Sequence, residues 1–92
     1  YNPDYEFGGK ILEYNKDKSI IEIRNKLNVG DTMEILIPEK IEPYEFTIDK
    51  LWDTDTEAEV EFVNPGKAGQ SIKMHLPIEC KNGWILRRKK SN

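Results

Sequence analysis

The sequence EAEVEF at residues 57–62 alternates strictly between acidic and apolar side chains. A period of two is typical of a β-strand that has one face on a core and the other in water. Short apolar-rich or alternating segments recur along the chain at residues 10–14, 19–24, 32–37, 44–49, 71–76 and 84–87. These segments correspond to about six to seven strands, a number and spacing that indicate an all-β fold. We expect a small closed or semi-open barrel, because closure hides the edges of a small sheet.

Turn residues separate the predicted strands. The polar sequence NKDK at residues 15–18 predicts a hairpin connection. Gly8 and Gly9 stand ahead of the first apolar stretch, where a barrel strand often needs a bend or a bulge. Gly30, in the sequence NVGD, is suited to a positive φ. A single short helical turn around residues 48–53 is an alternative to a strand there. The segment at residues 52–56 lacks the glycine that we expect in its turn.

Length and composition limit what the chain can be. Its 92 residues suit a single domain, 1–92, and a charged fraction of 34% indicates a heavily charged exterior. No apolar run approaches the roughly 20 residues of a membrane helix, so we expect no membrane partner. The start at Tyr1, without an initiator methionine, suggests a domain of a longer protein. The single cysteine, Cys80, excludes an internal disulfide and fits a cytoplasmic protein.

The sequence contains no complete catalytic or metal-binding motif. No visible group would orient His75 toward Cys80 in a nucleophilic pair. The run DTDTE at residues 53–57 begins like a calcium loop, but Ala58 and Asn64 stand where glycine and glutamate are required. One cysteine and one histidine cannot form a zinc site. We therefore predict no catalytic residue, no bound metal and no cofactor in this domain.

Positive charge is the strongest functional signal. The sequence RRKK at residues 87–90 is suited to tracking a phosphate backbone, whereas glutamates at positions 57, 59 and 61 would repel one. A solvated tail is the alternative interpretation. Trp52 and Trp84 are candidate stacking platforms, although Trp84 shares the parity of Leu86 and is expected to be buried. The candidate substrate- or RNA-binding residues are Arg24, Lys26, Lys67, Lys73, Arg87, Arg88, Lys89 and Lys90.

Longer stretches resemble a known family. They are YEFGGKILEYNKDKSIIEI (5–23), RNKLNVGDTMEIL (24–36), NPGKAGQSIKMHL (64–76) and WILRRK (84–89). Together they resemble the C-terminal domain of the collagenase-like peptidases, peptidase family U32, over nearly the whole chain. The resemblance implies a compact β-barrel similar to domain two of translation elongation factors. It also implies a parent protein whose catalytic domain lies upstream, so that no catalytic residue of the family falls within this chain.

The resemblance leaves two kinds of substrate open. Family members carry a peptidase label, and some resemble enzymes that hydroxylate RNA, so a polypeptide and an RNA are both implied. Our first hypothesis is an accessory domain that helps the upstream catalytic domain to hold such a substrate. The second is a structural module that packs against that domain or forms a dimer, through an apolar patch that includes Tyr1, Tyr5 or Ile85. Catalysis through Cys80 is a third and less favoured hypothesis.

Overall fold

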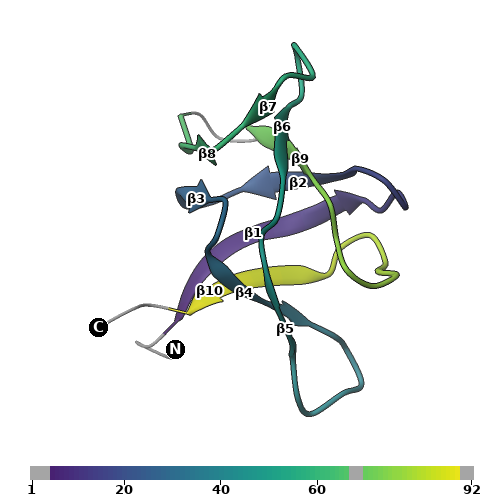
Figure 1. Cartoon of the computed structure of the whole chain (residues 1–92). Helices are drawn as coiled ribbons and strands as arrows, with labels where there is room; N and C mark the ends of the chain where they lie inside the picture. The colour runs from purple at the N-terminus through teal and green to yellow at the C-terminus, as the bar shows by residue number, and fades with distance from the viewer. Residues whose placement is uncertain (1–4, 67–69, 90–92) are drawn as a thin grey trace.

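The structure, a computed structural model, describes residues 5–66 and 70–89 (Figure 1). The secondary structure of the described residues consists of strands, and they include no helix. The strands are β1 (Tyr5–Glu13), β2 (Ser19–Ile23), β3 (Leu27–Asn28), β4 (Thr32–Leu36), β5 (Tyr44–Thr47), β6 (Leu51–Asp53), β7 (Glu59–Val60), β8 (Phe62–Val63), β9 (Ser71–Met74) and β10 (Ile85–Lys89). Eight of them form one sheet in the order β5-β4-β10-β1-β2-β9-β6-β7, and β3 pairs with β8 in a second sheet.

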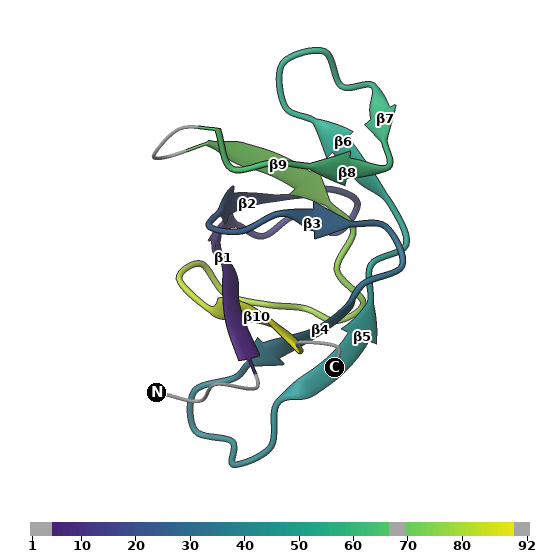
Figure 2. The same cartoon turned by 90° about the vertical axis from the view of Figure 1, so that its left-hand side faces the viewer.

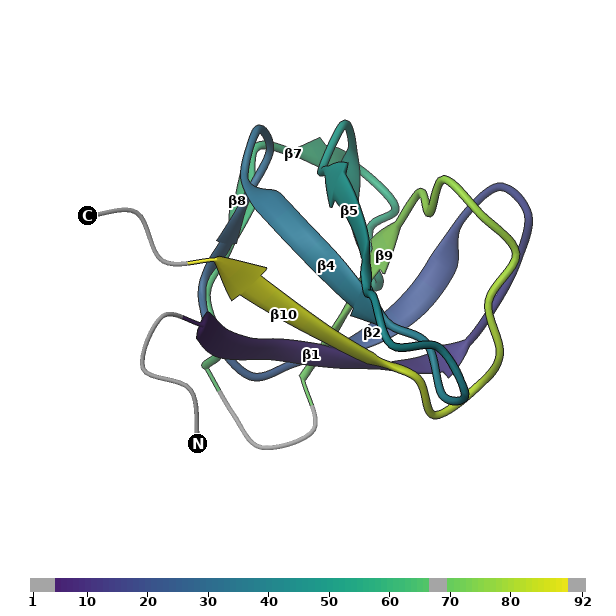
Figure 3. The same cartoon turned by 90° about the horizontal axis from the view of Figure 1, so that it is seen from below.

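The large sheet curls into a half-barrel, as Figure 2 shows from the side. All of its neighbouring strands run antiparallel, and β1, β10 and β4 lie side by side in Figure 3. β5 stands at one end of the strand order and β6 near the other, although only residues 48–50 separate them in the chain. This short segment therefore links the two ends of the curled sheet. Ile48 within it is buried.

Aliphatic side chains at alternate positions fill the interior of the half-barrel. Ile21 and Ile23 of β2 are buried, and the residues on either side of Ile21 are partly exposed. Ile21 lies opposite Ile11 on β1 and Ile72 on β9, so one core layer crosses three strands. Burying a side chain of this size stabilises a fold by about 1.5–3 kcal/mol. The buried core consists of Ile11, Ile21, Ile23, Leu27, Met33, Ile35, Ile48, Leu51, Val63, Ile72, Met74, Leu76, Cys80 and Leu86.

A bulge in β1 confirms the bend predicted at the two glycines. The register between β1 and β10 shifts between Phe7 and Gly9. A Cβ atom at Gly9 would lie 2.5 Å from the backbone oxygen of Glu22 on β2, so only glycine permits this approach. Bulges redirect neighbouring side chains. Phe7, directly before the bulge, is exposed.

The prediction of an all-β barrel is confirmed, but the strands are shorter and more numerous than predicted. Residues 57–62 do not form one strand, because β7 pairs with β6 whereas β8 pairs with β3. The chain bends at Glu61, whose carbonyl accepts a hydrogen bond from the N–H of Val29 at 2.8 Å. The alternation stops at this bend. Phe62, which shares the parity of Val60, is consequently exposed, and Val63 is buried instead.

The short helical turn that the sequence allowed around residues 48–53 does not form. Residues 51–53 are strand β6, in which Leu51 lies opposite Val60 on one side and Met74 on the other. Leu51 is fully buried between these two neighbours. Pairing on both sides of this segment favours the extended conformation over a single turn of helix.

The turn after β6 forms without a glycine because a carboxylate stabilises it. Oδ1 of Asp53 accepts hydrogen bonds from the N–H groups of Asp55 at 2.8 Å and Thr56 at 2.9 Å. These two bonds lower the pKa of Asp53. Glu57 then adopts a φ of 60°, a conformation that favours glycine. The acidic run that resembles the start of a calcium loop is therefore a capped turn.

Candidate functional site

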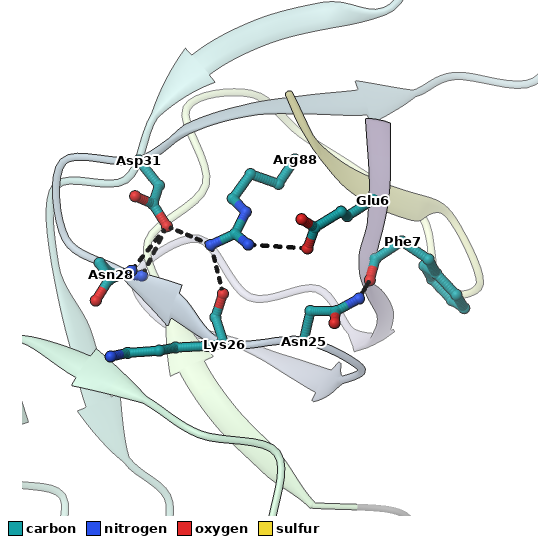
Figure 4. A network of polar contacts seen from close by, with 7 residues as sticks. All are labelled: Glu6, Phe7, Asn25, Lys26, Asn28, Asp31 and Arg88. Carbon is teal, nitrogen blue, oxygen red and sulfur yellow. Dashed lines mark hydrogen bonds and ion pairs between the residues drawn. The ribbon is translucent and has the colours of Figure 1, made fainter. Parts of the chain in front are cut away.

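Arg88 holds several elements together at one end of the half-barrel (Figure 4). Its Nη2 donates to Oε2 of Glu6 at 2.8 Å. Its Nη1 donates to the carbonyl oxygen of Lys26 at 2.8 Å and to Oδ2 of Asp31 at 3.3 Å. The same oxygen of Asp31 accepts the backbone N–H of Asn28 at 2.9 Å. The guanidinium thus connects β10 to β1 and to the segments before and after β3.

Arg87, the preceding residue, is engaged on the other face of the sheet. Its Nε donates to Oε1 of Glu34 on β4 at 2.7 Å, and its Cζ lies 3.8 Å from the ring centroid of Tyr5. Glu34 is buried, and a buried carboxylate is costly without a cation beside it. The arginines of the predicted basic run therefore serve internal contacts in this structure, and Tyr5 of the predicted apolar patch lies against one of them.

Lys73 also has an internal partner. Its Nζ lies 2.8 Å from Oε1 of Glu57. The hydrogen bond from Lys73, together with the charges of Lys73 and Lys18, lowers the pKa of Glu57. Lys18 lies over Trp52, with its Nζ 4.7 Å from the ring centroid. Trp52, one of the predicted stacking platforms, is thus partly buried and has a cation over its ring. Trp84 packs, partly buried, against the core.

Two predicted cations differ from the others because each lies over an exposed aromatic ring. Cζ of Arg24 is 5.6 Å from the ring centroid of Phe7, and Nζ of Lys26 is 5.0 Å from that of Phe62. Phe7 is 42% exposed and Phe62 is 52% exposed. Arg24 pairs at 3.0 Å with Glu22, whereas Lys26 forms no ion pair with any residue in 5–66 or 70–89. We call Phe7, Arg24, Lys26 and Phe62 the basic–aromatic rim.

Hydrogen bonds fix the backbone of the basic–aromatic rim. Nδ2 of Asn25 donates to the carbonyl oxygen of Phe7 at 2.6 Å, and Arg88 holds the carbonyl oxygen of Lys26. Figure 4 shows Lys26 and Phe7 on either side of Asn25. Two residues of extended chain span at most about 7 Å, which limits the separation of the Cα atoms of Arg24 and Lys26. In Figure 4 the side chain of Lys26 and the ring of Phe7 extend in opposite directions from Asn25, so the rim consists of two cation–ring pairs, one on each side of Asn25. The rim therefore offers two cations and two apolar rings on a fixed backbone.

Sequence reasoning found the cations of the rim and missed its aromatic residues. Phe62 belongs to an alternating stretch that places it in the core, and only the bend at Glu61 exposes it. For Phe7 a signal was available, because the residue directly precedes a predicted bulge. Lys67 and Lys90 lie outside the described residues, as does the side chain of Lys89, whose backbone pairs with Tyr5.

Cys80 and His75 do not form a nucleophilic pair. Cys80 is buried, its Sγ donates to the carbonyl oxygen of Ile78 at 3.3 Å, and burial raises the pKa of the thiol to about 11. The thiol is therefore protonated near neutral pH and poorly nucleophilic. Nδ1 of His75 instead lies 3.2 Å from Oδ2 of Asp49.

The described part of the chain has neither a metal-binding cluster nor a membrane helix. Residues 5–66 and 70–89 contain no group of three histidine, cysteine, aspartate or glutamate side chains placed to hold a metal ion. Within the same ranges, no helix has the length and apolar character needed to cross a membrane.

Comparison with known proteins places these observations in a family. Residues 3–87 match the family model described as the peptidase family U32 C-terminal domain. Two crystal structures of the C-terminal domain of a Geobacillus thermoleovorans protein assigned to the U32 peptidases are similar. One has a TM-score of 0.78 at 26% identity, over 92% of this chain and 93% of the other. The second, a selenomethionine variant, has a TM-score of 0.74 at 27% identity, over 89% and 98%. No match was found among curated proteins.

Proposed function

The chain belongs to the family of peptidase U32 C-terminal domains, and on this basis we propose that it is a non-catalytic accessory domain of a U32 protein. In this proposal it helps an upstream catalytic domain of the same protein to hold a large substrate, a polypeptide or an RNA. The domain supplies binding surface and the upstream domain supplies the chemistry. A cytoplasmic location completes the proposal and is supported by the single cysteine.

The observation that carries the proposal is the basic–aromatic rim. Aromatic side chains and arginine are enriched in protein contact surfaces relative to the rest of a protein's surface. Phe7 and Phe62 are about half exposed, and a cation lies 5.0–5.6 Å from the centroid of each ring. Of the predicted binding residues that the structure describes with their side chains, Arg87, Arg88 and Lys73 have structural contacts, which leaves Arg24 and Lys26 to meet a substrate.

The state of Cys80 supports the non-catalytic part of the proposal. A thiol with a pKa of about 11 is almost entirely protonated at neutral pH, and its hydrogen donates to a backbone carbonyl. Its position inside the core also keeps it from a macromolecular substrate. We therefore assign the chemistry of the parent protein to its upstream domain.

The test compares the parent protein with a version that lacks residues 1–92. Fluorescently labelled, denatured casein and labelled bulk tRNA are the two probes. We expect the shortened protein to bind one of the probes more weakly, while circular dichroism shows that its catalytic domain remains folded. Equal binding of both probes by the two versions would contradict the proposal.

A structural role is the second candidate, and two exposed apolar side chains in and beside one loop favour it. Ile41, in the connection between β4 and β5, is 102% exposed, and Tyr44 at the start of β5 is 41% exposed. The residues proposed from sequence for such a patch lie elsewhere: Tyr5 packs against Arg87, Ile85 is partly buried, and Tyr1 is outside the described residues. Sedimentation of the domain, alone and with the upstream domain, tests this role. A domain that sediments as a monomer and does not associate with the upstream domain would exclude the structural role.

A further inference from the structure

We propose that the basic–aromatic rim binds a polypeptide segment in which acidic residues are flanked by apolar side chains. The inference rests on the proposed role in holding a substrate, and it names the class of that substrate. Its basis is the charge that remains available at the rim after the internal ion pairs of the domain have formed.

The cations of the rim are suited to carboxylates. Lys26 has no carboxylate partner within residues 5–66 and 70–89, and its backbone is fixed by the 2.8 Å hydrogen bond from Arg88. Arg24 pairs with Glu22 through Nη2, and its side chain is 53% exposed. A guanidinium has five N–H donors, so this pair leaves donors for a second carboxylate. A ligand can therefore pair with both cations without breaking a contact of the core.

The rings of the rim are suited to apolar side chains. Phe7 and Phe62 stand beside Arg24 and Lys26, respectively, so each apolar surface adjoins a cation. Val29 is also exposed, and its N–H donates to the carbonyl oxygen of Glu61, the residue before Phe62. An apolar side chain of the ligand that covers one of these surfaces removes it from water. Carboxylates between apolar side chains reproduce this arrangement of charge and apolar surface.

An RNA strand matches the described charges less well. Its affinity grows with the number of phosphates that cations neutralise along a positive track. Lys73, Arg87 and Arg88 already pair with carboxylates of the domain. Glu22 pairs with Arg24, and the exposed Glu61 directly precedes Phe62, so acidic side chains accompany both cations of the rim. This balance suits one or two carboxylates better than a chain of phosphates.

Fluorescence anisotropy with the 92-residue chain tests the inference. The main probe is a labelled peptide of about twelve residues with Phe-Glu-Glu-Phe between glycine and serine. Controls carry Phe-Gln-Gln-Phe or Ala-Glu-Glu-Ala, and a single-stranded RNA of similar length is the competing ligand. We expect either control peptide to bind about three- to tenfold more weakly, as loss of exposed ion pairs or apolar contacts implies.

Variants assign the binding to the rim. Arg24→Ala combined with Lys26→Ala, and separately Phe62→Ala, should weaken binding of the acidic peptide about three- to tenfold. Lys40→Ala combined with Ile41→Ala removes an exposed cation and an exposed apolar side chain from another loop and should leave affinity unchanged. Circular dichroism confirms that every variant is folded.

Each contrary result has a distinct meaning. Tighter binding of the RNA than of the acidic peptide would overturn the inference and leave the substrate-holding role in place. Equal affinity for the Glu and Gln peptides, or equal losses in the rim and loop variants, would also overturn it. Absence of binding to the acidic peptide overturns the inference too, and the comparison of the parent with its shortened version then decides the proposed function independently.

Discussion

Arg88 and Glu6 lie 82 positions apart in the chain and form a 2.8 Å hydrogen-bonded ion pair between β10 and β1. The same guanidinium reaches the carbonyl oxygen of Lys26 and the carboxylate of Asp31. One side chain thus joins the first and last strands of the chain and also holds the backbone from which the basic–aromatic rim projects. In the proposed function, Arg24→Ala and Lys26→Ala should therefore weaken binding with little loss of stability, whereas Arg88→Ala should affect both.

Arg88→Ala should lower the free energy of unfolding by about 1–3 kcal/mol, because Glu6 and Asp31 are left without their cation in partly buried positions. Urea denaturation measures the change. Arg24→Ala is the control and should change the stability by no more than about 1 kcal/mol, since the side chain of Arg24 is 53% exposed and pairs with a single carboxylate, that of Glu22. Equal effects of the two substitutions would show that the network of Arg88 is not structural.

Gly9→Ala should destabilise the domain more than Gly8→Ala. A Cβ atom at Gly9 would lie 2.5 Å from a backbone oxygen of Glu22, whereas at Gly8 it would meet the flexible end of Met33, Cε, at 2.7 Å. Because backbone in a paired strand yields less than a methionine side chain, we expect a loss above about 2 kcal/mol at Gly9 and about half of it at Gly8. Thermal unfolding of both variants checks the order, and the reverse order would show that the β1 bulge is misassigned.

Gly30→Ala should lower the free energy of unfolding by about 1–2 kcal/mol, because alanine is strained in the backbone conformation of this position. Gly30 has a φ of 96°, and no atom lies within 4 Å of an added Cβ, so strain rather than a clash sets the cost. Gly30→Asn should cost less, because asparagine tolerates positive φ better than alanine. Gly66→Ala is a control at a glycine without a positive φ. Identical melting temperatures for the Gly30 and Gly66 variants would contradict the turn.

The Cys80 thiol should make the domain sensitive to alkaline pH. Burial raises its pKa from 9.0 to about 11, so the unfolded chain loses this proton first as the pH rises. The protonated thiol therefore contributes about 1–3 kcal/mol to the free energy of unfolding below pH 9. This contribution is lost as the pH rises to about 11. Urea unfolding across this range should show a steeper decline for the native protein than for Cys80→Ala. Parallel curves would mean that the thiol is accessible to water.

Local sequence patterns predicted the class of the fold and its turns because strand alternation, the bulge glycines and the φ of Gly30 are local properties. The pairing of residues 57–62 was not predictable in this way. These residues divide between two sheets, because Val60 faces Leu51 whereas Val63 faces Leu27. The turn at Asp53 shows the same limit, since a carboxylate there replaces the glycine that sequence reasoning expects.

The candidate site was predictable only in part. Sequence reasoning selects cations by type, but their partners are set by strand register: Arg87 lies opposite Glu34, and Arg88 opposite Glu6. Register between distant strands is not visible in a single sequence. The basic run therefore appeared as a binding tail, and the exposed phenylalanines beside Arg24 and Lys26 were missed.

The most direct test of the binding role is a nuclear magnetic resonance titration of the ¹⁵N-labelled domain with the acidic Phe-Glu-Glu-Phe peptide. The account predicts that the amide shifts which change lie at residues 24–28, Phe7 and Phe62, and that the Arg24→Ala, Lys26→Ala double variant needs about three- to tenfold more peptide for the same changes. Changes confined to the loop around Ile41 and Tyr44, or spread evenly over the half-barrel, would contradict it.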